Sequence, residues 1–271
     1  MELTLLDADF ERLTVFIKNN YGINLAQKRQ LVASRLGSTV TDQGFGDFSG
    51  YINHILKTKK TADIENIINK LTTNYTFFMR EKQHYDFFRN VVLPDLIERH
   101  QRDKVISIWS AGCSSGEEPY NISMYIKDFL GTKAKDWDTR VLATDICQQV
   151  LEKAKEGKYE LPDTIPSNWQ TKYFVPTKDP KVFEVAPDIK KNVIFQTFNL
   201  MDNIRFKLKF DIIFCRNVMI YFDQPTKDAL CQRYYDATTP GGYLFIGHSE
   251  SLNKNTPYKT LAPATYQKAN K

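Results

Sequence analysis

The chain lacks the features that mark membrane-spanning, secreted and zinc-binding proteins. Its 271 residues contain no run of about 18 apolar residues that could span a bilayer. The N-terminal stretch MELTLLDADFERL does not have the basic-then-apolar order of a signal peptide. The four cysteines are widely spaced and form no C-x-x-C pair. We therefore expect a cytoplasmic protein with reduced thiols, no metal site and no insertion into a membrane.

A strong net charge is also missing. The formal charge of +5 is weaker than the dense basic footprint of nucleic-acid-binding proteins, so nucleic acid is not an expected partner. The composition, 42% apolar and 25% charged, is ordinary for a globular protein of one large domain or two modest ones. The oligomeric state stays open, and a monomer is the default expectation.

Acidic residues are absent from one segment, residues 12–41, which we call the acid-free segment. It holds five cations: Arg12, Lys18, Lys28, Arg29 and Arg35. Such a segment is either a solvated helix face or a docking surface for an acidic partner. Lys28, Arg29 and Arg35 are the candidates for docking.

Residues 1–72 carry only helical signals and predict a small all-helical domain. Asp7 or Asp9 can cap a first helix, and TADIENIINKL places four apolar residues at helical spacing. Residues 73–104 then predict a linker followed by a long helix near residues 81–100. This helix would be the first of a second domain.

Residues 105–271 predict an α/β domain. Short β-branched runs alternate with helical segments: VISIWSA, RVLATDI, VIFQTFNL, FDIIFCRN and GGYLFIGHS. This alternation is typical of a mostly parallel sheet with helices on both faces, and ligands of such sheets bind beyond the carboxyl ends of the strands. Residues 156–191 break the pattern and contain five of the eleven prolines. We expect a small β-rich insertion there.

The first strand runs into a small-residue turn and a helix, IWSAGCSSGEEPY, but lacks the G-x-G-x-x-G order of dinucleotide-binding proteins. Gly112 and Gly116 can let the backbone approach a ligand. Glu117 and Glu118, at the start of the helix, would repel a pyrophosphate. They would instead favour a nucleoside with an ammonium and a sulfonium group, which describes S-adenosylmethionine. Alternatively, the two acids only complement the helix dipole.

The other strand ends also present polar side chains: Asp145, Asn199, and Arg216 with Asn217. Asp145 follows the glycine turn at the distance of the acid that accepts hydrogen bonds from ribose hydroxyls in Rossmann folds. Its other interpretation is an N-cap of the helix CQQVLEKAKE. Both interpretations stay open at this point.

Six segments together closely resemble the CheR family of chemotaxis receptor methyltransferases, in the family's order. They are TTNYTFFMRE (72–81), WSAGCSSGEEPY (109–120), ATDI (143–146), FNL (198–200), FCRNVMIYFD (214–223) and GGYLFIGHSE (241–250). The resemblance covers nearly the whole chain. It implies a Rossmann-like class I S-adenosylmethionine-dependent methyltransferase sheet, an N-terminal helical domain (1–72) and a β-subdomain inserted at 156–191. The implied activity is glutamate methyl ester formation on the cytoplasmic helices of chemoreceptors.

The resemblance also implies roles for individual residues. Asn74, Thr76 and Arg80 would reach the cofactor from the linker, and Gly112 and Glu118 would lie near its methionine part. Asp145 would bind the ribose, Asn199 and Leu200 would lie along the adenosine, and Arg216 with Asn217 would close the site. Two departures are Met79, where the family often has Phe, and the turn variant AGCSSG; neither removes a polar contact. In some relatives the inserted subdomain binds a receptor C-terminal pentapeptide and in others it does not.

Arg80 and Tyr221 are the catalytic candidates. Arg80 could hold the substrate carboxylate, and Tyr221 could donate a hydrogen bond or tighten the surroundings of the methyl group. Each also has a plainer interpretation: Arg80 as a surface partner of Glu81, and Tyr221 as a half-buried aromatic residue. His248 is interpreted as a strand-end histidine without a role.

Two other functions share much of this pattern. A nucleic-acid amino-methylase would have the same sheet, but such enzymes show an Asp/Asn-Pro-Pro-aromatic stretch after the fourth strand, where this chain has RNVMIY. A non-catalytic sensor that binds the cofactor and docks on receptors is the alternative from another class.

Overall fold

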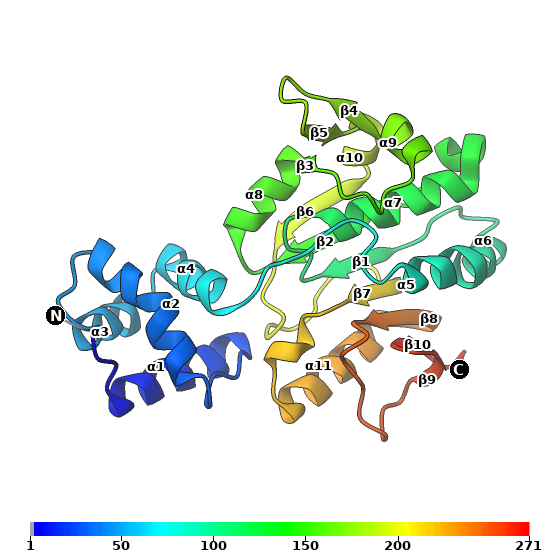
Figure 1. The fold of residues 1–271 in the computed structure, drawn as a ribbon. Helices are drawn as coiled ribbons and strands as arrows, with labels where there is room; N and C mark the ends of the chain where they lie inside the picture. Colours follow the sequence, from blue (N-terminus) through cyan, green and yellow to red (C-terminus); the bar gives the residue numbers. More distant parts are fainter. Residues whose placement is uncertain (1–2, 271) are drawn as a thin grey trace.

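Four helices form the N-terminal lobe of the computed structural model, which describes residues 3–270 (Figure 1). They are α1 (Asp7–Tyr21), α2 (Arg29–Asp42), α3 (Phe48–Thr58) and α4 (Thr61–Leu71). The apolar residues of α4 are buried at the spacing that the sequence predicts: Ile64, Ile67, Ile68 and Leu71. The expected all-helical N-terminal domain is therefore confirmed.

The start of α1 differs from the expectation. The helix begins at Asp7 after Leu6, and no side chain caps it. The carboxylate of Asp9 instead lies 3.2 Å from Nη1 of Arg12 and accepts a hydrogen bond from Ser49 in α3. The predicted capping by Asp7 or Asp9 is wrong, because Asp9 is buried and joins α1 to α3.

The helix expected near residues 81–100 consists of three contiguous pieces. They are α5 (Lys82–Phe87), a π turn (Phe88–Val92) and α6 (Leu93–Arg99). Pro94 explains the wide turn, since proline has no N–H to donate and its ring would clash with the carbonyl of Asn90 in a regular α-helix. The π turn relieves this conflict without ending the helix.

A seven-stranded sheet in the order β6-β2-β1-β7-β8-β10-β9 forms the centre of the second lobe. The parallel strands are β1 (Ile108–Ala111), β2 (Val141–Asp145), β6 (Val193–Thr197), β7 (Phe210–Cys215) and β8 (Thr238–Ile246). The mostly parallel sheet is as predicted. The C-terminal pair β9 (Lys259–Ala262) and β10 (Thr265–Gln267), which joins the sheet antiparallel to β8, was not predicted.

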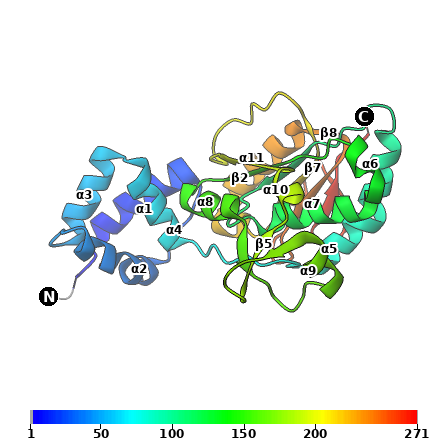
Figure 2. The same cartoon turned by 90° about the horizontal axis from the view of Figure 1, so that it is seen from above.

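Both faces of the sheet are covered. Helix α7 (Glu117–Leu130) and helix α11 (Gln224–Ala237) lie on opposite sides of it (Figure 2). Neighbouring residues of β1 accordingly belong to different apolar clusters, Ile108 to the one with α7 and Trp109 to the one with α11. The indole N–H of Trp109 donates to Oγ1 of Thr144 at 2.9 Å, so its polar atom is satisfied in the core.

Residues 156–191 contain a separate three-stranded antiparallel sheet, β3 (Lys158–Glu160), β5 (Val182–Val185) and β4 (Phe174–Pro176). Two short helices accompany it, α9 (Ser167–Tyr173) and α10 (Pro187–Lys190). It follows α8 (Gln148–Glu156) and projects above the main sheet in Figure 1. This is the predicted β-rich insertion. No helix within residues 3–270 has the length and apolar character needed to cross a membrane.

The two lobes touch beside the sheet. The backbone N–H of Asn24 donates to the carbonyl of Tyr221 at 2.7 Å, and Lys18 forms an ion pair with Asp223 at 2.7 Å. One apolar cluster runs from α1 through Ile23 to Phe222 in the second lobe. The N-terminal lobe therefore packs directly against the ends of the strands.

Candidate active site

A cleft opens where the two lobes meet, beyond the carboxyl ends of the parallel strands. Its walls include every cofactor and catalytic candidate from the sequence: Asn74, Thr76, Arg80, Gly112, Glu118, Asp145, Asn199, Leu200, Arg216, Asn217 and Tyr221. These residues come from the linker and from four strand ends. The fold brings them together, while their individual roles remain predictions.

The glycine turn after β1 owes its shape to close packing. Gly112 has a φ of +78°, and a Cβ there would lie 2.4 Å from Cγ2 of Val218. A Cβ on Gly116, with a φ of +96°, would lie 2.8 Å from Cβ of Ala154. Larger residues would therefore be strained at both positions. Of the two glycines, Gly112 lines the cleft and Gly116 packs against α8.

The side chain of Asp145 holds the glycine turn through hydrogen bonds to backbone N–H groups. Its Oδ2 accepts the backbone N–H of Ser114 at 2.9 Å, and its Oδ1 accepts the N–H of Cys147, the residue before α8, at 3.1 Å. Burial raises the pKa of Asp145, and these two N–H donors oppose that rise. The alternative interpretation of Asp145 as the N-cap of α8 is wrong, because Cys147 is the N-cap and no side chain caps the helix. Each carboxylate oxygen of Asp145 keeps a second acceptor site, so a role as a ligand acceptor stays a prediction.

The two glutamates at the start of α7 have different surroundings. Glu118 faces the cleft, where its Oε1 accepts the hydroxyl of Ser110 at 2.8 Å and its Oε2 lies 3.0 Å from Nη1 of Arg216. Burial raises the pKa of Glu118, and the charge of Arg216 opposes this. Glu117 is not part of the cleft wall; it accepts a hydrogen bond from Ser115. The expectation that both acids face the ligand was wrong.

Arg216 is buried at the end of β7, with 2% of its side chain exposed. Besides Glu118, its guanidinium donates to the Tyr85 hydroxyl at 3.1 Å, to Oε2 of Glu81 at 3.2 Å and to the carbonyl of Arg80. The sequence indicated Arg216 but neither Glu81 nor Tyr85. The possible surface pair of Arg80 with Glu81 is not formed, because Glu81 binds Arg216.

The linker is tightly turned at Arg80. Met79 and Glu81, on either side, have φ values of 64° and 54°, a left-handed conformation that non-glycine residues rarely adopt. Nη1 of Arg80 donates to the carbonyl of Tyr75 at 2.9 Å, which holds the guanidinium at the cleft wall. Strained residues of this kind cluster at functional sites. The turn therefore supports a role for Arg80 in the cleft.

Tyr221 contacts the start of the linker at Thr73. Its hydroxyl donates to the carbonyl of Thr73 at 3.0 Å and accepts the N–H of the same residue at 2.8 Å. The hydroxyl proton is thus already used. Tyr221 shapes the cleft by holding the linker, and a hydrogen bond to substrate would require it to leave Thr73.

The N-terminal lobe contributes wall residues that the sequence did not indicate, namely Tyr21, Ile23 and Ile68. Asn199 connects this lobe to the strand ends, since its Nδ2 donates to the carbonyl of Asn20 at 2.8 Å. No local pattern marks these residues, because their position depends on how the lobes pack. The sequence indicated only that a helical domain precedes the linker, not which of its residues reach the cleft.

The three docking candidates lie outside the cleft wall. Lys28 and Arg29 are exposed at the start of α2, and Arg29 lies 3.3 Å from Asp7. Arg35 has a structural contact: its Nη1 donates to the carbonyls of Lys70 and Thr72, at 2.9 and 3.1 Å. Arg35 therefore holds the end of α4. Arg29 is exposed but also donates to the carbonyl of Leu5, and Lys28 is exposed.

Two family models match the chain. Residues 8–72 match the model described as "CheR methyltransferase, all-alpha domain", and residues 74–267 match "CheR methyltransferase, SAM binding domain". The matched regions meet at the linker.

Curated relatives match over most of their length. The chain is 40% identical to the chemotaxis protein methyltransferase of Borreliella burgdorferi, over 99% of this chain and 96% of that protein. It is 38% identical to the chemotaxis protein methyltransferase of Escherichia coli, over 93% of this chain and 87% of that protein. For chemotaxis protein methyltransferase 1 of Pseudomonas aeruginosa the identity is 36%, over 93% of each chain. With both domains matched and relatives this similar, the chain belongs to the CheR methyltransferase family, whose cofactor is S-adenosylmethionine.

Proposed function

We propose that this protein forms methyl esters on glutamate side chains of chemoreceptors, in the cytoplasm, during sensory adaptation. The names of the curated relatives support a role in chemotaxis. The observation that carries the proposal is the guanidinium of Arg80, which lines the same cleft as Asp145 and Glu118. It offers a cationic anchor for a substrate carboxylate beside a cofactor site.

The polar and apolar side chains of the cleft are suited to the parts of S-adenosylmethionine. Asp145 has free acceptor sites for ribose hydroxyls, and Glu118 with Gly112 borders the space suited to the amino-acid arm. Leu200 and Phe198 add an apolar wall suited to the adenine ring. When bound, the cofactor supplies a methyl group on a positively charged sulfur. Asn74, Thr76 and Asn217 would complete the binding site from the linker and from β7.

The substrate carboxylate needs positioning rather than deprotonation. A glutamate side chain has an ordinary pKa of about 4.3 and is already ionised at neutral pH. Arg80 uses Nη1 for the carbonyl of Tyr75, which leaves donors that can hold one carboxylate oxygen while the other attacks. Tyr221 keeps the linker, and so Arg80, in place. Positioning of this kind supplies a large share of the rate in two-reactant reactions.

The start of α2 is suited to an acidic partner. Lys28 and Arg29 lie at the positive end of the helix dipole, and the first turn of α2 contains no acid. Methylation removes the negative charge of a glutamate, so attraction to this surface would fall after the reaction. We include Arg35 in the docking row, although its contacts with the end of α4 give it a structural role as well.

The first prediction concerns the product and its pH dependence. Labelled methyl groups transferred to receptor-containing membranes should be released as methanol by mild base, because esters hydrolyse and N-methyl groups do not. With receptor saturating, the rate should be flat between about pH 6.5 and 8.5, since no catalytic base titrates there. A base-stable label, or a rate that climbs steeply with pH, would indicate an amine or hydroxyl nucleophile instead.

The second prediction concerns the ribose contact. Asp145→Ala should weaken S-adenosylhomocysteine binding by about 1.5–3 kcal/mol, the range for lost hydrogen bonds to a charged group. Calorimetric titration measures this. Asp138→Ala is the matched control. Asp138 lies just before the start of β2, whereas Asp145 ends that strand, and Asp138 pairs with Arg140. Unchanged affinity in a folded Asp145→Ala protein would remove Asp145 from the site.

The third prediction separates alignment from binding. Arg80→Ala should lower the single-turnover rate about 100-fold or more with both sites filled, because a shift of about 1 Å in the reacting groups can cost that much. Arg89→Ala is the control, since Arg89 pairs with Asp128 away from the cleft wall. A full rate in Arg80→Ala would leave the ester chemistry intact but end the role of Arg80.

The fourth prediction concerns docking. The double variant Lys28→Glu/Arg29→Glu should raise the KM for receptor and leave S-adenosylhomocysteine affinity unchanged. The difference in the KM for receptor between the wild type and the variant should shrink as added salt shortens the electrostatic screening length below about 8 Å. Lys133→Glu/Lys135→Glu changes the net charge equally at exposed positions after α7 and serves as the control. Normal receptor methylation by the α2 variant at low salt would contradict the docking assignment.

A further inference from the structure

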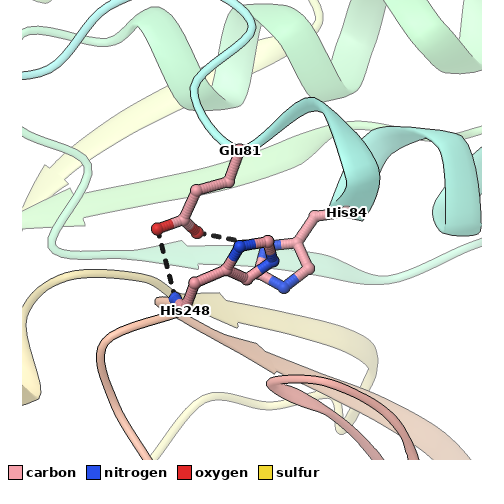
Figure 3. A group of neighbouring side chains, drawn as sticks. All are labelled: Glu81, His84 and His248. Atoms are coloured by element: carbon pink, nitrogen blue, oxygen red, sulfur yellow. Dashed lines mark hydrogen bonds and ion pairs between the residues drawn. The ribbon is translucent and has the colours of Figure 1, made fainter.

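Glu81, His84 and His248 gather beside the cleft (Figure 3). Glu81 lies in the linker, His84 in α5, and His248 two residues after β8. One potential ligand atom from each lies within 4.8 Å of the others, and no other such group of three occurs among residues 3–270. Glu81 and His84 are three residues apart, but His248 lies more than 160 positions further along the chain, so no local pattern joined the three and we expected no metal.

His84 provides a buried imidazole beside the carboxylate of Glu81. Only 2% of its side chain is exposed, and neither ring nitrogen has a hydrogen-bond partner within the described part of the chain. Nδ1 nevertheless lies 3.3 Å from Oε2 of Glu81. Tetrahedral zinc with bonds of about 2.0–2.1 Å separates its ligand atoms by about 3.4 Å, so this pair already has the spacing of two zinc ligands.

His248 can supply the third ligand. Its ring centre lies 4.3 Å from that of His84, and the residue is exposed. The backbone N–H of His248 donates to Oε1 of Glu81 at 3.1 Å, which fixes the main chain next to the carboxylate. An exposed imidazole on a fixed backbone can turn toward a metal by side-chain rotation alone.

We propose that Glu81, His84 and His248 form a binding site for one transition-metal ion of the zinc class. Two imidazoles and a carboxylate are a donor set that zinc accepts in proteins, with a further position left for water or another ligand. The four cysteines are all buried and lie outside this group, so thiolates do not compete for an ion that reaches the surface here.

The neighbours of Glu81 weaken the site and connect it to the cleft. Nη2 of Arg216 lies 3.2 Å from Oε2 of Glu81, the same oxygen that faces His84, and Nδ2 of Asn217 lies 3.2 Å from Oε1. An ion at Oε2 must compete with Arg216. Because Arg216 also binds Glu118 in the cleft wall, metal binding would change the contacts of a residue that shapes the cleft.

The test is a zinc titration of the full chain in competition with a chromophoric chelator. The wild-type protein should take up about one equivalent of Zn²⁺ with saturable binding, and His248→Ala should weaken it about tenfold or more. His54→Ala is the matched control, because His54 lies in α3, outside the group of three, and its ring is 3.7 Å from Asp63. His248→Ala keeps the backbone N–H that contacts Glu81, so the fold around the carboxylate is retained.

Co²⁺ gives a second measurement on the same proteins. Its visible absorption should report coordination by nitrogen and oxygen in the wild type and in His54→Ala, and should be lost in His248→Ala. Absence of saturable Zn²⁺ binding to the wild type would overturn the proposal. Equal binding by wild type and His248→Ala would do so too, as would equal weakening by His54→Ala. The test needs neither cofactor nor receptor, so its failure leaves the methyl-transfer proposal untouched.

Discussion

The buried guanidinium of Arg216 is the interaction around which the cleft is built. A buried charge is costly unless it is paired, and removal of one partner of such a pair typically costs about 3–5 kcal/mol. The partners of Arg216 come from separate segments: Glu118 from the start of α7, Tyr85 from α5, and Glu81 with the carbonyl of Arg80 from the linker. Their position relative to β7 is therefore fixed by one charge.

This pairing explains the course of the linker. Met79 and Glu81 adopt left-handed backbone conformations that cost about 1–3 kcal/mol each, and such strain persists only where the surroundings enforce it. The bond from Glu81 to Arg216 provides that constraint on one side of Arg80. At the other end, Arg35 holds the carbonyl of Thr72, and Tyr221 holds both backbone groups of Thr73. The linker is thus attached at both ends, which keeps Arg80 at the cleft wall.

The sequence predicted what depends on local pattern and missed what depends on packing over long distances. Polar residues at strand ends, such as Asp145, Asn199 and Arg216, were found because parallel strands bring their carboxyl ends to one edge of the sheet. Glu81 was missed because nothing near it in the sequence shows that it pairs with a residue 135 positions away. Tyr21 was missed for the same reason, since it reaches the cleft only through lobe packing. Pro94 could have indicated an interruption of the helix near residue 90, but not that it takes the form of a π turn.

The pairing of the cleft's acids changes how ligand selection is understood. From sequence, Glu117 and Glu118 suggested a negative field that repels phosphate and attracts a cation. In the structure Glu117 is turned away, Glu118 is neutralised by Arg216, and Asp145 holds two backbone N–H groups. What remains is a set of acceptors with fixed directions and little net charge. Selection then rests on hydrogen-bond geometry within the cleft, which leaves Arg80 as a cation available to a substrate carboxylate. Longer-range attraction of an acidic partner would have to come from outside the cleft, from the exposed cations at the start of α2.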